Sequence, residues 1–215
     1  MIDKIFPRLH NEGYKFLVIF GLATLVLYLI NGFLGFIGVV LTVWVYYFFR
    51  DPERYPINDD KFLVSPADGL ITDISEKTGP EELRLENTSY KRISVFMNVF
   101  NCHVNRIPSS GKVEEIFYKP GKFLNASLDK ASEENERNYF KIKLNNGEEI
   151  IIVQIAGLIA RRIVCEVEQG QDLKQGDRIG MIRFGSRADI YYENYEPLVK
   201  IGQTSIAGET LLAKK

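Results

Sequence analysis

The chain has 215 residues, enough for one ordinary domain with a short additional segment and for a sizeable buried core. Its 27 basic and 28 acidic side chains give a formal net charge of -1, so charge does not support nucleic acid as a partner. The two cysteines, Cys102 and Cys165, are too few for a disulfide framework and lack the spacing of metal ligands. We therefore predict no metal site and expect both thiols to be buried and reduced.

The first feature along the chain is an apolar run at 16–49 that contains no charged residue. Asn31-Gly32 divides it into halves, each shorter than the ~20 residues of a comfortable membrane span. A cleaved signal peptide is disfavoured by the length of the run, and a buried soluble helix pair by its lack of charge. We expect residues 1–49 to form an α-helical membrane hairpin, either spanning or re-entrant.

Basic residues flank this run on both sides, namely Lys4, Arg8 and Lys15 before it and Arg50 and Arg54 after it. Flanking positive charge predicts that both ends of the hairpin lie on the cytoplasmic side of the cell membrane. Small residues let helices approach closely in lipid, and the run contains four glycines: Gly21, Gly32, Gly35 and Gly38.

Residues 50–63 carry prolines and many charges, which predicts an exposed linker. From 64 to 215, short β-rich runs alternate with turn signals, including "NNG" at 145–147, which predicts a hairpin turn. The polar segment 121–138 interrupts this rhythm and is expected to be a long loop. The predicted fold class is therefore mainly β. The pattern of glycine-rich turns and short strands is typical of hammerhead or barrel-sandwich β domains.

The stretch "RFGSRADIY" at 183–191 places Gly185 directly before Ser186. A plain turn is the simplest interpretation of this pair. The alternative is self-cleavage, in which the Ser186 hydroxyl attacks the Gly185 carbonyl, which no Cβ shields. Elimination and hydrolysis would then leave a pyruvoyl group at 186 and two chains, 1–185 and 186–215. Such a carbonyl is an electron sink suited to amino-acid decarboxylation.

Two further residues are candidates for this chemistry. Asp68 in "VSPADG" could orient an imidazole, although an Asx-type turn explains it as well. His103 in "FMNVFNCHVNRIP" is the only histidine outside the N-terminal segment, where His10 lies. A satisfied, partly buried histidine is the alternative at this position. Asn98 and Asn101 in the same stretch are expected to cap local structure.

These motifs resemble one family when they are taken together and in order. "FFRDPER", "VSPADG", "FMNVFNCHVNRIP", "IAGLIARRI", "GDRIGMIRFGSRADIY" and "IGQTSIAGETLLA" are similar to the short form of phosphatidylserine decarboxylase. The resemblance runs from about Phe48 to the C-terminus. It implies self-cleavage at Gly185-Ser186, a pyruvoyl cofactor derived from Ser186, and a charge-relay role for Asp68. His103 matches the first histidine of the Y-H-R-V-H-x-P motif of longer members, whereas Arg106 stands at the second.

The resemblance implies conversion of phosphatidylserine to phosphatidylethanolamine and carbon dioxide in phospholipid biosynthesis, with catalytic Ser186, His103 and Asp68. Paired donors make arginine suited to phosphate, so Arg161, Arg162 and Arg106 are candidate ligands of the lipid headgroup. A solvated pair at a hairpin corner is the alternative for Arg161 and Arg162. The partners are a phospholipid, the membrane and the two cleavage products; homo-oligomer formation stays open. Alternative functions are decarboxylation of an ether-linked, archaeal-type serine phospholipid, or a noncatalytic membrane-tethered β scaffold.

Overall fold

The computed structural model describes residues 6–126, 133–158, 162–183 and 186–215. The chain divides into two compact units, Met1–Glu53 and Arg54–Lys215. The division falls within the segment that was predicted to be a linker.

The first unit contains a helical hairpin, as predicted. Helix α2 spans Gly13–Ile30 and helix α3 spans Gly32–Phe48. Asn31 joins them in an extended conformation, and its side chain accepts a hydrogen bond from the Phe33 N–H at 2.8 Å, which caps α3. The hairpin predicted from the asparagine-glycine pair therefore has a local cause in the capping of α3.

Two of the four glycines in the apolar run allow the helices to approach closely. A Cβ at Gly35 would lie 2.7 Å from the Tyr28 ring, and one at Gly38 would lie 2.8 Å from Thr24 Oγ1. The Thr24 hydroxyl also lies 2.9 Å from the Thr42 hydroxyl of the facing helix. Gly21 and Gly32 have no such neighbour within 4 Å, so the expectation of close packing holds for Gly35 and Gly38 alone.

Helix α2, with 18 residues, is long and apolar enough to cross a membrane, whereas α3 is an apolar helix of 17 residues. Most side chains of both helices are exposed, including Leu22, Leu29 and Phe36. Exposed apolar side chains in this number are unfavourable in water and favourable in lipid, so this unit supports membrane association.

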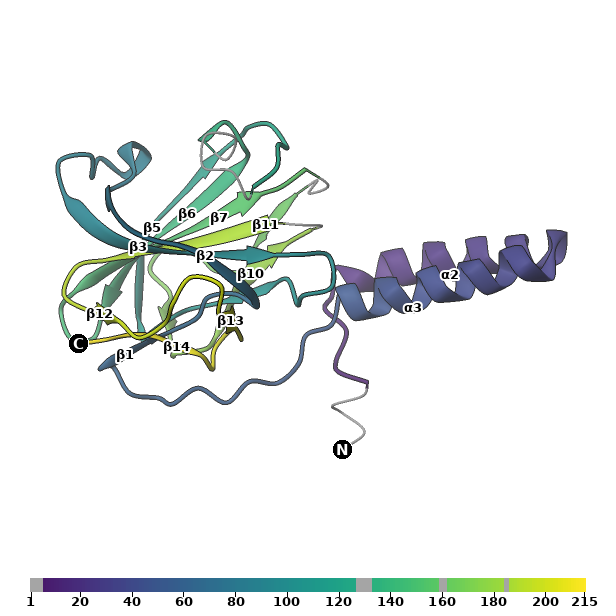
Figure 1. The fold of residues 1–215 in the computed structure, drawn as a ribbon, viewed down its shortest axis with the longest axis horizontal. Coiled ribbons are helices and arrows are strands. Elements are labelled where there is room, and N and C mark those ends of the chain that lie inside the picture. Colours follow the sequence, from purple (N-terminus) through teal and green to yellow (C-terminus); the bar gives the residue numbers. More distant parts are fainter. Residues whose placement is uncertain (1–5, 127–132, 159–161, 184–185) are drawn as a thin grey trace. The chain divides into compact units, whose positions relative to one another are not determined.

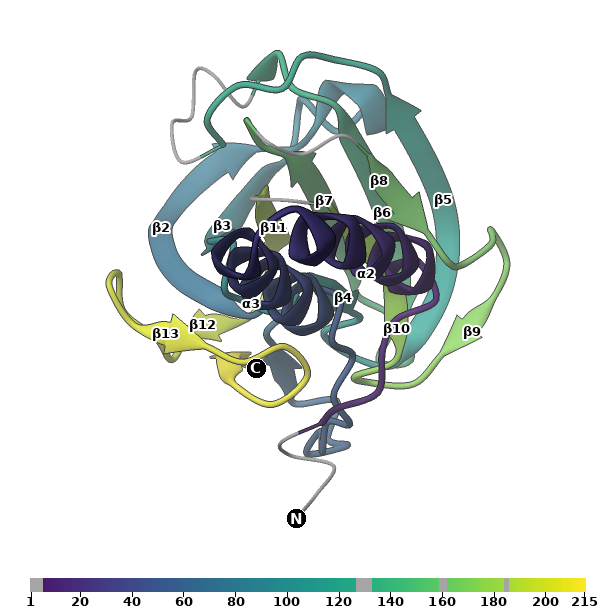
Figure 2. The same ribbon diagram turned by 90° about the vertical axis from the view of Figure 1, so that its right-hand side faces the viewer.

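The second unit is mainly β, as predicted, and its described residues form three sheets. The largest has eight strands in the order β13-β2-β3-β11-β7-β6-β5-β9. Their bounds are β2 Gly69–Thr78, β3 Ser89–Met97, β5 Gly111–Lys119, β6 Arg137–Leu144, β7 Glu149–Ala156, β9 Asp172–Leu173, β11 Ser186–Tyr192 and β13 Thr204–Ser205. Figure 2 shows this sheet curling into a half-barrel, with β2 and β5 on opposite sides.

The other elements among the described residues of this unit are two three-stranded sheets and a short 3-10 helix. One sheet has the order β1-β14-β12 and the other β4-β10-β8. Their bounds are β1 Phe62–Val64, β14 Leu211–Lys214, β12 Glu196–Pro197, β4 Val104–Arg106, β10 Arg178–Ile182 and β8 Ile163–Cys165, and the 3-10 helix η1 covers Glu81–Leu83. The pairing of β1 with β14 and of β13 with β2 joins the C-terminal residues to the start of the domain.

Strand β11 is central in the large sheet, since β3 and β7 pair with it on either side. Its residues are buried throughout. Alternate residues face the main core, where Ala188 and Ile190 pack with residues of β3 and β7. Tyr191 faces a second, smaller cluster on the other side. Burial on both faces is why "ADIYY" lacks the alternation of a half-exposed strand.

The predicted hairpin turn at 145–147 is present between β6 and β7, with Gly147 at φ 87°. The expectation that both thiols are buried is wrong for Cys165. Cys102 is buried, but Cys165 is exposed because it lies near the end of the short strand β8. The loop predicted at 121–138 ends earlier, since Arg137 already begins β6.

Candidate active site

Ser186 is the first residue of β11 and lies between Met97 of β3 and Ala156 of β7 in the sheet register. The sequence placed it in a turn, and the structure places it at the start of a strand. Its side chain is fully buried, and its hydroxyl lies 3.7 Å from the Met97 sulfur, a weak acceptor. Gly185, the other half of the predicted cleavage site, lies outside the described residues.

His103 is fully buried just before β4. Its Nδ1 lies 3.0 Å from the carbonyl oxygen of Asn101. Because a carbonyl only accepts hydrogen bonds, this contact requires the proton on Nδ1. The backbone carbonyl of His103 accepts from the Ile182 N–H at 3.3 Å, which connects the histidine to the end of the strand that precedes Ser186.

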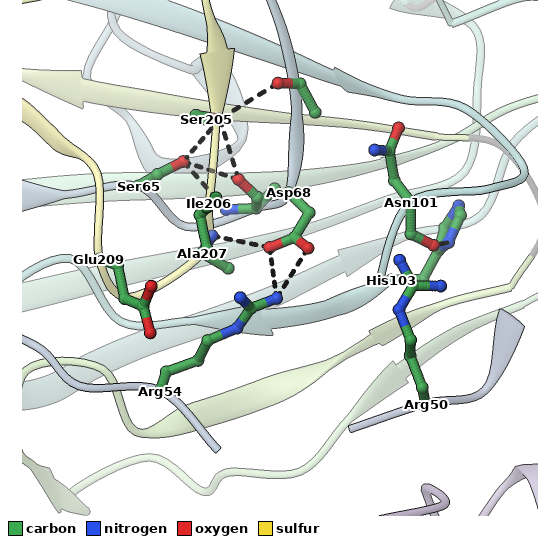
Figure 3. Close-up of polar contacts among 12 residues, drawn as sticks. Arg50, Arg54, Ser65, Asp68, Asn101, His103, Ser205, Ile206, Ala207 and Glu209 are labelled. Carbon is green, nitrogen blue, oxygen red and sulfur yellow. Dashed lines mark hydrogen bonds and ion pairs between the residues drawn. The ribbon is translucent and has the colours of Figure 1, made fainter. Parts of the chain in front are cut away.

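Asp68 lies immediately before β2 and has partners that the sequence did not predict. Its Oδ2 lies 2.7 Å from Arg54 Nη2, and its Oδ1 accepts from the Ala207 N–H at 2.8 Å. Figure 3 shows Asp68 grouped with Arg54 and Ala207, whereas His103 lies beside Asn101. Among the described residues the Asp68 carboxylate has no hydrogen bond to His103. Its charge-relay role stays a prediction.

Two serine hydroxyls fix the segment that leads into Asp68. Ser65 and Ser205 are both buried, and their hydroxyls lie 3.2 Å apart (Figure 3). Each donates to the Ala67 carbonyl, at 2.7 Å and 3.1 Å respectively. The "VSPADG" motif is therefore held against the C-terminal segment by side-chain hydrogen bonds as well as by the pairing of β2 with β13.

The three arginines predicted to bind the headgroup differ in environment. Arg106 is buried in β4, where Nη1 donates to the Gly176 carbonyl at 2.8 Å. Arg162 is exposed, and its carbonyl accepts from the Arg183 N–H at 3.1 Å. Arg161 lies outside the described residues. Exposure makes Arg162 accessible to a phosphodiester, whereas the Arg106 guanidinium already donates to a backbone carbonyl.

A chain of buried amides that the sequence motifs did not predict lies on the same sheet face as Ser186. Gln154 Nε2 donates to Asn105 Oδ1 at 2.9 Å, and Gln154 Oε1 accepts from Asn138 at 3.3 Å. Asn105 also lies 3.6 Å from the Met97 sulfur, which Ser186 contacts as well. A single glutamine inside the apolar run "IIIVQIA" was the available signal, because a polar residue in a buried strand needs a partner.

The opposite face of β11 carries a buried ionic cluster. Arg187 Nε lies 2.9 Å from Asp189 Oδ1, and Arg92 Nη1 lies 3.7 Å from Asp189 Oδ2. A cavity of about 160 Å³ opens on this face and is lined in part by these residues and Tyr191. Burial, followed by the charge of Asp189, raises the pKa of Tyr191, so this tyrosine is neutral at ordinary pH.

Comparison with known proteins places this chain among the decarboxylases. The family model for phosphatidylserine decarboxylase matches residues 41–213. The chain is 67% identical to the phosphatidylserine decarboxylase proenzyme of Pelagibacter ubique over 215 residues, which is 100% of both chains. It is 55% identical to that of Ruegeria pomeroyi, covering 99% of this chain and 98% of the relative, and 54% identical to that of Cereibacter sphaeroides, covering 99% and 92%. The chain belongs to the phosphatidylserine decarboxylase family of carboxy-lyases, which confirms the resemblance seen in the sequence.

Proposed function

We propose that this chain cleaves itself between Gly185 and Ser186, that Ser186 becomes a pyruvoyl group, and that the mature enzyme decarboxylates phosphatidylserine to phosphatidylethanolamine. The observation that carries the proposal is the position of Ser186 at the start of a central strand, paired on both sides. After cleavage, β11 keeps the hydrogen bonds to β3 and β7. Residue 186 is therefore held in place without its link to residue 185.

The self-cleavage involves only atoms of the chain and water. The Ser186 Oγ attacks the Gly185 carbonyl carbon, and an ester replaces the amide. Loss of the Ser186 Cα proton then expels the Gly185 carboxylate and leaves dehydroalanine, which takes up water and releases ammonia. The products are a chain of residues 1–185 and a chain of residues 186–215 that begins with the pyruvoyl group.

The surroundings of Ser186 fit such a group. The site is buried and already contains amide side chains, so a carbonyl there would not lie in a purely apolar core. When present, the pyruvoyl carbonyl supplies an electron sink for the electrons released as carbon dioxide leaves.

His103 holds and moves the proton in this proposal. With Nδ1–H directed to the Asn101 carbonyl, Nε2 is the atom that takes up a proton and returns it to the decarboxylated product. Asp68, bound by Arg54, orients the segment before β2, and Arg162 is exposed for the headgroup phosphate, with Arg161 and Arg106 as further candidates.

The helical hairpin holds the enzyme at the membrane, where its lipid substrate resides. A phospholipid moved into water exposes its acyl chains at a cost of ~0.8 kcal/mol per methylene, so a membrane-bound enzyme avoids this cost. Basic residues on both sides of the hairpin favour the cytoplasmic side for the catalytic unit.

Intact-mass spectrometry of the purified full-length protein tests the proposal. We expect two chains, with the 186–215 chain carrying pyruvoyl in place of serine, and a single chain for Ser186→Ala. A folded wild-type protein that stays one chain of 24.6 kDa would support the noncatalytic scaffold instead. Release of labelled carbon dioxide from diacyl and ether-linked serine phospholipids then separates the two substrate alternatives.

A further inference from the structure

The turn between β3 and β4 presents an aromatic side chain close to the candidate active site. Phe100 is 72% exposed at this turn, just beyond Met97, the sheet partner of Ser186. The turn is ordered by its asparagines. The Phe100 N–H donates to Asn98 Oδ1 at 2.9 Å, and the Asn98 N–H donates to Asn101 Oδ1 at 2.9 Å. Phe100 is thus held outward by a hydrogen-bonded turn.

A second apolar side chain is exposed on the other side of Ser186. Leu158 is 68% exposed, just beyond Ala156, the other sheet partner of Ser186. The register of β3, β11 and β7 places the starts of these two turns on either side of the strand that begins with Ser186. The two exposed apolar side chains therefore follow the two strands that pair with the strand beginning at Ser186.

The polar groups of this end of the sheet suit a membrane interface. The N–H groups of Asn98, Phe100 and Asn101 are all hydrogen bonded within the turn, so the turn can leave water without breaking them. Arg162 is exposed and connected through its carbonyl to Arg183, shortly before Ser186 in the chain. An exposed cation together with exposed apolar side chains is the combination that binds an anionic lipid surface.

We propose that Phe100 and Leu158 insert into the interfacial layer of a phospholipid bilayer and thereby orient the catalytic unit towards its substrate. The inference rests on the proposed function, because a substrate in the bilayer is the reason for this end of the sheet to face lipid. The Asn101 carbonyl is bonded to His103 Nδ1, so the inserted turn is also directly connected to the catalytic histidine.

Fluorescence quenching tests insertion without requiring turnover. In full-length protein with Trp44→Phe, Phe100→Trp and Leu158→Trp are compared separately with Leu198→Trp in phosphatidylserine-containing vesicles with brominated acyl chains. Leu198 is 50% exposed and follows β12, which comes after the far end of β11. We expect strong quenching at 100 and 158 and weak quenching at 198. Equal, weak quenching at all three sites would overturn the proposal, and so would a protein-concentration-dependent blue shift at 100 and 158 without quenching, which indicates a second copy.

An activity measurement distinguishes an effect on membrane orientation of the catalytic unit from an effect on the decarboxylation step. Phe100→Ser and Leu158→Ser should lower the rate on bilayer phosphatidylserine about tenfold, the factor expected for losing one buried apolar anchor. The rate on monomeric short-chain phosphatidylserine, normalised to the cleaved fraction, should not change, and Leu198→Ser should match wild type on both. An equal loss on both substrates would refute membrane orientation by these residues. Inactive wild-type protein with strong quenching would instead refute the proposed function alone.

Discussion

Asp68 is bound by Arg54 through a contact of 2.7 Å between Oδ2 and Nη2, with 13% of each side chain exposed. The same carboxylate accepts the Ala207 N–H. Arg54 and Asp68 belong to the segment 1–185 and Ala207 to the segment 186–215. The hydrogen bond from Ala207 to Asp68 therefore connects the two products of the proposed cleavage, and Arg54 holds the accepting carboxylate in place.

Asp68→Ala should lower the free energy of unfolding by about 2 kcal/mol, because Ala207 and Arg54 each lose a charged hydrogen-bond partner. Arg54→Ala should cost a similar amount. Because both single variants remove the same Arg54–Asp68 interaction, the double variant should lose about 1 kcal/mol less than the sum of the two single losses. Urea unfolding of the mature protein, with release of the 186–215 chain as a second readout, measures these values. Additive losses would show that the contact carries no coupling.

His103→Ala should reduce the rate of decarboxylation by about a hundredfold, the lower range for loss of a general acid or base. The rate is measured as carbon dioxide released per cleaved chain, so a defect in self-cleavage does not enter it. His103→Gln serves as a control of similar size. Wild-type activity per cleaved chain in His103→Ala would remove this residue from the mechanism.

The sequence predicted the elements whose signals are local. The helical hairpin follows from an uncharged apolar run divided by Asn31-Gly32, and the turn between β6 and β7 follows from its glycine at positive φ. Ser186 was misplaced in a turn because its strand is defined by pairing with Met97 and Ala156, which are distant in sequence. Cys165 was misjudged because burial depends on where a short strand ends in the fold.

In the candidate site, too, local motifs were predictable and tertiary contacts were not. Ser186, His103 and Asp68 were identified through motifs, and the environments that define them came from tertiary structure. Nothing adjacent in the chain indicates that Arg54 binds Asp68, or that Gln154 and Asn105 share a hydrogen bond behind Ser186. A sequence can predict that a buried polar group has a hydrogen-bond partner, because such a group requires one. It does not show which residue the partner is.

Asp189→Asn should be strongly destabilising, by about 3 kcal/mol, since Arg187 and Arg92 would lose their shared buried counterion. The side chains of these three residues are 1–6% exposed. The matched control is Glu196→Gln, whose carboxylate pairs with Lys91 and is 80% exposed. It should cost less than about 1 kcal/mol. Thermal and urea unfolding of both variants in the uncleaved Ser186→Ala background provide the comparison, and similar losses would contradict the importance of burial here.

Tyr192→Phe should stabilise the protein by about 1 kcal/mol near neutral pH. The Tyr192 hydroxyl is buried and has no hydrogen-bond partner among the residues that the structure describes. Removing a buried, unsatisfied polar group relieves its desolvation cost. Tyr195→Phe should do the opposite, because its hydroxyl lies 2.8 Å from Asn146 Nδ2 and 3.3 Å from the Asp60 carbonyl oxygen.

The stabilities of Tyr192→Phe and wild type should also differ in their dependence on alkaline pH. Burial, followed by the charge of Glu196, raises the pKa of Tyr192 above its ordinary value of 10.0. A pKa raised by folding gives a stability contribution that is fully present below about pH 10 and is lost as the pH rises towards the folded-state pKa. The free energy of unfolding of Tyr192→Phe should therefore fall less than that of wild type between pH 8 and pH 11, roughly the window that this shift affects. Urea titrations across this range measure the difference, and an equal fall in both proteins would show that Tyr192 ionises as readily folded as unfolded.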